Sequence, residues 1–154
     1  MKYIQNHQKM GGCVFCHAQK MEDGPENLIV CRGRLAFLIL NRFPYTTGHL
    51  MAVPNVHSPS LDLLQPEVRA EMMELAARAV TVLTRVYHPD GFNLGINIGS
   101  AAGAGIAEHL HFHVLPRWGG DTNFMASVAD TRVLPETLED SYRRVKEAWL
   151  AHSD

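Results

Sequence analysis

The sequence predicts a single α+β domain built on an antiparallel sheet, and three observations support this fold class. Short apolar runs recur along the chain with turn residues between them, which is typical of strands that neighbour one another in pairs. Two longer stretches instead carry apolar residues at helical spacing. The chain has 154 residues, which is long enough to bury one substantial core. We therefore expect five strands and two main helices.

The N-terminal half holds three of the expected strands. Apolar runs over 28–32 and 35–40 flank a Gly-Arg pair, which predicts a hairpin. After a loop, residues 49–53 predict a third strand, which ends at Pro54 because proline cannot donate to a strand ladder.

The C-terminal half predicts two helices and two further strands. Residues 66–87 carry apolar side chains near one helical face, and Pro66 suits the first turn of a helix. Runs over 92–98 and 109–115 predict two more strands, joined by a glycine-rich loop. A last helix is expected where apolar residues recur at helical spacing, at Leu138, Tyr142, Val145 and Trp149.

Composition favours a soluble cytoplasmic protein. Hydrophobic residues make up 46% and charged residues 19%, which are ordinary values for a globular domain. The formal net charge of -2 argues against a nucleic acid polymer as partner. No apolar run could span a bilayer, so no membrane partner is expected. Residues 1–12 predict a loose N-terminal arm without a secretory core, and 13–154 a single domain.

The most informative feature is a run of three alternating histidines, His109, His111 and His113. Residues two apart in a strand share one face, so the three imidazoles are expected side by side on a solvent-facing or cleft-facing surface. The apolar residues between them would face inward. Imidazole is a nucleophile, a proton carrier near neutral pH and a metal ligand. The run therefore predicts a chemical site.

A second motif is Cys13-Val-Phe-Cys16, whose spacing lets two thiolates hold one metal ion. A structural zinc site needs two further ligands, and the chain offers His17, His49, His57 and the triad itself. A redox role is less favoured because the motif does not lie between a strand and a helix of a βαβ unit. Two unliganded thiols near a flexible arm are the alternative.

These motifs resemble those of the histidine triad (HIT) family. The run from His109 to Leu115 resembles its signature, His-x-His-x-His followed by two apolar residues. The resemblance covers residues 13–120. The runs Ala102–His111 and Pro116–Phe124 look like the branch of diadenosine tetraphosphate phosphorylases and related hydrolases. Further matches fall in the family's order, at Cys13-x-x-Cys16, Asn41, Pro44, Gly48-His49 and Val53-Pro54-Asn-Val-His57.

The resemblance implies a HIT-like fold, with a five-stranded antiparallel sheet that pairs with that of a second subunit in a homodimer. It also implies hydrolysis or transfer at the α-phosphate of a dinucleoside polyphosphate, or a related nucleotide, through a covalent nucleotidyl-histidine. His111 matches the family's nucleophile, which divides one hard displacement into two easier ones. His113 and His49 match positions that contact the phosphate oxygens or the leaving group.

For the metal, the resemblance implies a structural zinc held by Cys13, Cys16, His57 and His109. Such a closed tetrahedral Cys₂His₂ set is a structural type, not an open catalytic one. No organic cofactor is expected.

Nucleotide recognition has several candidate residues. Asn41 matches the family position that hydrogen-bonds the ribose hydroxyls. Phe15 and Leu40 are candidates to flank the base, with plain core residues as the alternative. Trp118 is a candidate to stack on a base, with a dimer contact as the alternative. The candidates near the phosphates are Asn97 and the backbone amides of the loop Gly103–Gly105.

The chain departs from the commonest family pattern in the loop before the triad. Gly105 and Ile106 stand where many members carry amide and hydroxyl side chains, which fits a branch that binds polyphosphate through backbone. Two rival functions stay open. One is a nucleotide-binding sensor or scaffold with little catalysis, and the other is a metalloenzyme whose three triad histidines hold a catalytic metal. The motif does not choose between water and inorganic phosphate as acceptor.

Overall fold

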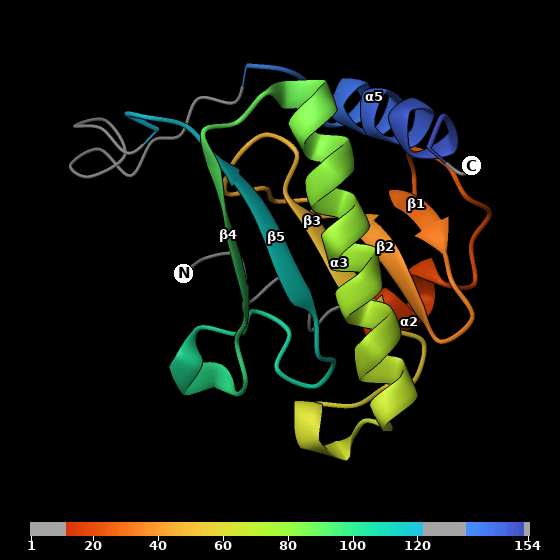
Figure 1. Ribbon diagram of the computed structural model, residues 1–154. Helices are drawn as coiled ribbons and strands as arrows, with labels where there is room; N and C mark the ends of the chain where they lie inside the picture. Colours follow the sequence, from red (N-terminus) through yellow and green to blue (C-terminus); the bar gives the residue numbers. More distant parts are fainter. Residues whose placement is uncertain (1–11, 122–134, 153–154) are drawn as a thin grey trace.

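The computed structural model describes residues 12–121 and 135–152, and Figure 1 shows their arrangement. Nearly all of the arm expected over residues 1–12 lies outside these described residues. A short helix comes first, followed by three strands, a long helix, two more strands and a final helix. The five-stranded α+β architecture expected from the sequence is confirmed.

The strands form one antiparallel sheet in the order β1-β2-β3-β5-β4. Their bounds are β1 (Ile29–Arg32), β2 (Ala36–Leu40), β3 (Leu50–Pro54), β4 (Gly91–Ile96) and β5 (Phe112–Arg117). β1 and β2 form the hairpin that the sequence predicts, and β4 lies at one edge of the sheet. β5 lies between β3 and β4, so the strand that carries part of the triad adjoins the strand that follows His49.

Two long helices cover the sheet. α3 (Pro66–Tyr87) has the predicted bounds, lies across the sheet and contacts β2, β3 and β5 (Figure 1). α5 (Leu138–Leu150) contacts α3 and β1, near the opposite edge of the sheet from β4. Its first turn is capped by Thr137, whose hydroxyl accepts a hydrogen bond from the Asp140 backbone N–H. Both helices predicted from apolar spacing are confirmed.

Within the described residues, three short helical elements were not predicted. The first, α2 (Val14–Ala18), contains the second half of the cysteine motif. The others are 3-10 turns, Leu61–Leu63 before α3 and Ser100–Ala102 in the glycine-rich loop after β4.

The core surrounds two interior strands, β2 and β3, in which every residue is buried. Burying one large apolar side chain contributes about 1.5–3 kcal/mol, so this region anchors the fold. The approach to β3 needs glycine at position 48. Gly48 has a φ of +75°, and a Cβ there would lie 2.8 Å from the Tyr87 ring of α3. This close approach places the next residue, His49, inside the core, where none of its surface is exposed.

The triad strand begins later than the sequence predicts. β5 starts at Phe112, so His113 lies in the strand while His109 and His111 precede it. The reason is a long-range contact, because the Leu110 N–H donates to the Ser58 carbonyl at 2.7 Å. Of the two alternatives for the row of imidazoles, solvent-facing or cleft-facing, the solvent-facing one is wrong. All three side chains are buried, with exposed fractions of 0%, 5% and 6% in chain order.

Candidate active site and metal centre

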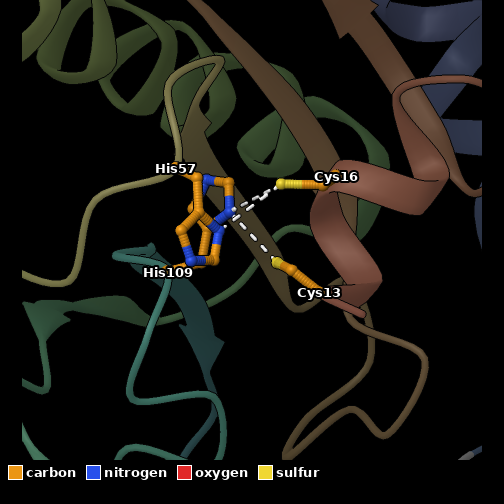
Figure 2. A group of neighbouring side chains, drawn as sticks. All are labelled: Cys13, Cys16, His57 and His109. Carbon is orange, nitrogen blue, oxygen red and sulfur yellow. Dashed lines mark hydrogen bonds between the residues drawn. The ribbon is translucent and has the colours of Figure 1, made fainter. Parts of the chain in front are cut away.

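Four side chains from three parts of the chain meet beside the sheet (Figure 2). Cys13 caps the start of α2 and Cys16 lies within it, while His57 follows β3 and His109 precedes β5. One ligand atom from each residue lies within 4.8 Å of the others. Figure 2 shows both thiols pointing toward the two imidazoles. The structure therefore brings together all four residues that the sequence analysis assigned to a metal.

Three distances between ligand atoms of the group are compatible with tetrahedral coordination of one ion. His109 Nδ1 lies 3.2 Å from Cys13 Sγ and 3.6 Å from Cys16 Sγ, and His57 Nδ1 lies 3.4 Å from Cys16 Sγ. Sulfur and nitrogen ligands about 2.0–2.3 Å from one zinc ion lie at comparable distances from each other. Burial raises the pKa of the Cys13 thiol, so a cation beside it is needed to hold the thiolate. We conclude that these residues could hold a metal ion.

The other nitrogen of His109 supports the same conclusion. His109 Nε2 donates to the Pro54 carbonyl at 2.9 Å, which leaves the lone pair on Nδ1 facing the sulfurs. Histidines that bind metals in proteins commonly donate their second N–H to a backbone carbonyl in this way. Among the described residues, neither His111 nor His113 belongs to a metal-binding group. The described geometry therefore gives no support to the rival hypothesis of one metal held by all three triad histidines.

His111 lies beside the metal-binding group with its two nitrogens in different environments. Its Nδ1 is 2.9 Å from the carbonyl oxygen of His109. A carbonyl only accepts hydrogen bonds, so Nδ1 carries the proton and Nε2 carries the lone pair. Burial lowers the pKa of His111, which keeps the imidazole neutral near pH 7. A neutral imidazole with an available Nε2 lone pair is a competent nucleophile.

His113 and His49 form a second, linked pair. The Tyr45 backbone N–H donates to His49 Nδ1 at 3.2 Å, so the proton of neutral His49 is on Nε2. That Nε2 lies 2.8 Å from His113 Nδ1 and donates to it, which places the proton of His113 on its own Nε2. His113 Nε2 is buried and has no hydrogen-bond partner in the described part of the chain. It is therefore a donor without an internal acceptor, on a ring 4.7 Å from that of His111.

Burial also keeps this pair neutral. It lowers the pKa of His49 to about 3, with a smaller effect from His113. It lowers the pKa of His113 to about 4, with a smaller effect from His111. At neutral pH both imidazoles therefore act as hydrogen-bond relays without a net charge.

The loop before β3 orients His49. Asn41 Nδ2 lies 3.3 Å from His49 Nδ1, and Asn41 Oδ1 accepts from the Phe43 N–H at 3.0 Å. The Tyr45 ring lies against the same imidazole, with centroids 4.7 Å apart, and stacks on His113 at 6.0 Å. Sequence reasoning missed Tyr45. The available signal was an aromatic residue in the loop leading to the Gly48-His49 pair.

The remaining nucleotide-binding candidates lie in three places. Phe15 and Leu40 are buried, with exposed fractions of 3% and 1%, which is the core alternative that the sequence left open. Asn97 is half-buried just after β4. Trp118 is half-buried just after β5, where its backbone N–H donates to Asp121 Oδ2. Gly103 and Gly105 are exposed in the loop between β4 and the triad. Their roles in binding stay predictions.

No helix within residues 12–121 and 135–152 has the length and apolar character needed to cross a membrane.

The five-stranded antiparallel sheet and the clustered histidines agree with the fold that the resemblance to the histidine triad family implies. The chain belongs to this family, because a sequence model described as the HIT domain matches residues 25–120. The resemblance seen in the sequence is thereby confirmed.

Individual relatives agree with the family. The chain is 44% identical over 124 residues to a protein of Mycobacterium tuberculosis named AP-4-A phosphorylase. The match covers 80% of this chain and 64% of that protein, so the chain spans less than two thirds of this relative. A Zn-bound histidine triad family protein from Mycobacterium smegmatis superposes with a TM-score of 0.72 and 29% identity, covering 91% and 94% of the two chains.

A more distant structure shares the fold alone. Plasmodium falciparum diadenosine triphosphate hydrolase superposes with a TM-score of 0.64 at 15% identity, covering 80% of this chain and 75% of that one.

The buried histidine pair predicts how stability depends on pH. The unfolded chain binds protons at His49 and His113 near their ordinary pKa of 6.5, whereas the folded chain binds them only near 3 and 4. Stability is therefore complete above pH 6.5 and falls as the pH drops toward 4. Between about pH 7.5 and about pH 5.5 each histidine should cost on the order of 1 kcal/mol of unfolding free energy.

Urea unfolding of metal-loaded protein at both pH values measures this loss. His113→Gln should reduce the difference between the two pH values, and the matched change His88→Gln at an exposed histidine should not. An unchanged pH dependence in His113→Gln would show that this group titrates normally in the folded protein.

Proposed function

We propose that the chain transfers a nucleotidyl group from a dinucleoside polyphosphate, such as diadenosine tetraphosphate, through a covalent bond to His111. The observation that carries the proposal is the assignment of protons within the buried histidine cluster. His111 holds its lone pair on Nε2, and the neighbouring His113 holds a proton on its own Nε2. A nucleophile next to a hydrogen-bond donor is the pair that displacement at a phosphate requires.

In the first step, His111 Nε2 attacks the α-phosphorus. A phosphorus–nitrogen bond forms, the bond from phosphorus to the bridging oxygen breaks, and the remaining polyphosphate leaves with the electron pair. His113 Nε2–H donates a hydrogen bond to a phosphate oxygen that gains negative charge. The His49 Nε2–H donates to His113 Nδ1 and so holds the His113 ring in this orientation. A terminal phosphate has a second pKa of about 6, so the leaving group needs a hydrogen-bond donor and no complete proton transfer at pH 7.

In the second step, an acceptor oxygen attacks the phosphorus and His111 leaves as a neutral imidazole. Inorganic phosphate as acceptor yields a nucleoside diphosphate, and water yields a nucleoside monophosphate. Phosphate brings an oxygen that is already ionised, whereas water must lose a proton. The similarity to the mycobacterial AP-4-A phosphorylase supports phosphate as the acceptor.

The ion proposed for the metal centre is zinc. Two thiolates and two imidazoles are a common structural zinc set, and the similar mycobacterial structure is described as Zn-bound. A closed four-ligand zinc supplies structural cross-linking and takes no part in the reaction. Cys13 and Cys16 would tie α2 to the segments that carry His57 and His109.

A homodimer is the proposed assembly. β4 lies at the edge of the sheet, and edge strands offer backbone groups that can pair with another chain. Large apolar side chains are exposed on β4, just after it, and on α3: the exposed fractions are 51% for Leu94, 48% for Ile98 and 55% for Met73. A second copy would cover these residues, and two-fold dimers are the commonest oligomers.

A cytoplasmic location is proposed from the state of the cysteines. The three cysteines form no disulfide, and two of them lie in the metal-binding group. Thiolate ligands persist best in a reducing compartment.

The first prediction concerns the nucleophile. His111→Ala should lower kcat by about 10³-fold or more, because the two-step route disappears. Binding of a non-hydrolysable dinucleoside polyphosphate should survive, because the contacts to base and ribose do not need the nucleophile. His17→Ala, at an exposed histidine, is the matched control and should keep full activity.

Radiolabelled substrate, quenched during turnover, should leave an acid-labile label on His111. Product analysis with and without inorganic phosphate identifies the acceptor. Label on another residue, or near-normal turnover by His111→Ala, would exclude the proposed mechanism. Clear binding by the wild-type chain without any turnover would favour the sensor or scaffold instead.

The second prediction concerns zinc. Purified protein should carry one zinc per chain, and Cys16→Ser should lose the ion and melt at a lower temperature, because metal-binding free energy is folding free energy. Cys31→Ser, at the cysteine outside the group, should keep both the zinc and the melting temperature. If the protein has the same melting temperature after zinc is removed by a chelator, the structural role is refuted.

The third prediction concerns assembly. Light scattering should give twice the chain mass, and Leu94→Lys should produce monomers, because lysine on an edge strand opposes pairing. Leu150→Lys, at an exposed leucine of α5, should leave the dimer intact. A wild-type monomer at working concentration contradicts the proposal.

A further inference from the structure

Besides the ring of His113, two contacts hold the His111 imidazole, one from a residue of the metal-binding group and one from a residue between its two cysteines. The first is the hydrogen bond from Nδ1 to the backbone carbonyl of His109, whose own side chain faces the two thiols. The second is a ring contact with Phe15, whose centroid lies 5.2 Å from that of His111 at an interplanar angle of 50°.

Phe15 occupies a specific place in this arrangement. It lies between Cys13 and Cys16 in the chain, and its side chain is buried. The same ring contacts His109 edge-on, with centroids 5.3 Å apart and planes at 74°. One aromatic ring therefore touches both the metal-facing histidine and the candidate nucleophile.

The helix that carries Phe15 has only five residues. Isolated helices shorter than about 12 residues are marginal in water, so α2 needs tertiary ties to keep its place. Its two cysteines, pointing toward His57 and His109 in Figure 2, provide such ties once a metal holds them. The position of the Phe15 ring should therefore depend on the metal.

We propose that Phe15 is a positioning residue that transmits the state of the metal centre to the nucleophile. With metal bound, the ring packs on the His111 imidazole and keeps Nδ1–H on the His109 carbonyl and Nε2 toward the substrate. Without metal, α2 loosens, the ring withdraws, and the imidazole rotates and exchanges tautomers. The catalytic meaning of this coupling rests on the proposed nucleotidyl transfer, whereas the coupling itself can be measured without turnover.

The test compares zinc-loaded Phe15→Leu with zinc-loaded Phe37→Leu. Phe37 is a buried phenylalanine of β2, so both changes remove a core ring of the same size. Three quantities are measured: zinc per chain, the tautomer of His111 from long-range ¹H–¹⁵N NMR, and kcat and KM separately. Phe15→Met, which keeps most of the volume without the ring, serves if the leucine variant folds poorly.

Phe15→Leu should retain one zinc and change His111 from a single Nδ1–H tautomer to a mixture. Its kcat should fall by about 10–100-fold with little change in KM, because a misdirected nucleophile affects the chemical step more than binding. Chelating zinc from the wild-type chain should produce a similar His111 spectrum. Phe37→Leu should change neither the spectrum nor kcat.

A wild-type His111 spectrum in Phe15→Leu, or in the chelated protein, would overturn the coupling. An equal change in Phe37→Leu would overturn it too, since the effect would then be general loosening of the core. If the wild-type chain proves to have no turnover, the NMR comparison still decides the coupling, so its failure and the failure of the proposed function are distinguishable.

Discussion

The hydrogen bond from His111 Nδ1 to the carbonyl of His109 is the constraint on which the rest of the site depends. Without such a partner, the proton of a buried neutral imidazole could lie on either nitrogen, and the ring would be free to rotate. The bond lies within three residues of chain, so it costs little backbone freedom to form. It holds only while His109 is fixed, which explains why the Pro54 carbonyl and the two thiols converge on that residue.

The same logic extends outward through the cluster. Backbone groups, which can only donate or only accept, decide which nitrogen of the neighbouring imidazole carries the proton. The Tyr45 N–H determines the tautomer of His49, and His49 then determines that of His113. Backbone carbonyls determine the tautomers of His109 and His111. Burial removes the competing charged forms, because it lowers the pKa of all four imidazoles. Four neutral rings thereby acquire defined donors and acceptors from backbone groups and from one another.

Local signals in the sequence predicted the parts of the fold that local physics decides. α3 was placed at its exact bounds because Pro66 suits a first turn and the apolar residues that follow keep helical spacing. The start of β5 was misplaced because a distant partner, the Ser58 carbonyl, takes the Leu110 N–H. α2 was missed because a five-residue helix depends on contacts that spacing does not reveal.

For the site, the period-two spacing of the three histidines predicted that their side chains share one face of a strand. The spacing could not predict that other elements bury these side chains, because those elements are distant in the sequence. Cysteine spacing predicted half of the metal site. His57 and His109 came from family resemblance alone, because two segments distant in sequence supply them.

The central claim is that the reaction proceeds by two displacements at one phosphorus, with His111 Nε2 as the intermediate bonding partner. The stereochemical course tests it most directly, using a dinucleoside polyphosphate whose α-phosphorus is made chiral by sulfur and oxygen-isotope substitution. Each in-line displacement inverts the configuration, so two of them restore it. We expect overall retention of configuration in the nucleotide product. Overall inversion would show a single direct displacement by the acceptor and would contradict a covalent histidine intermediate.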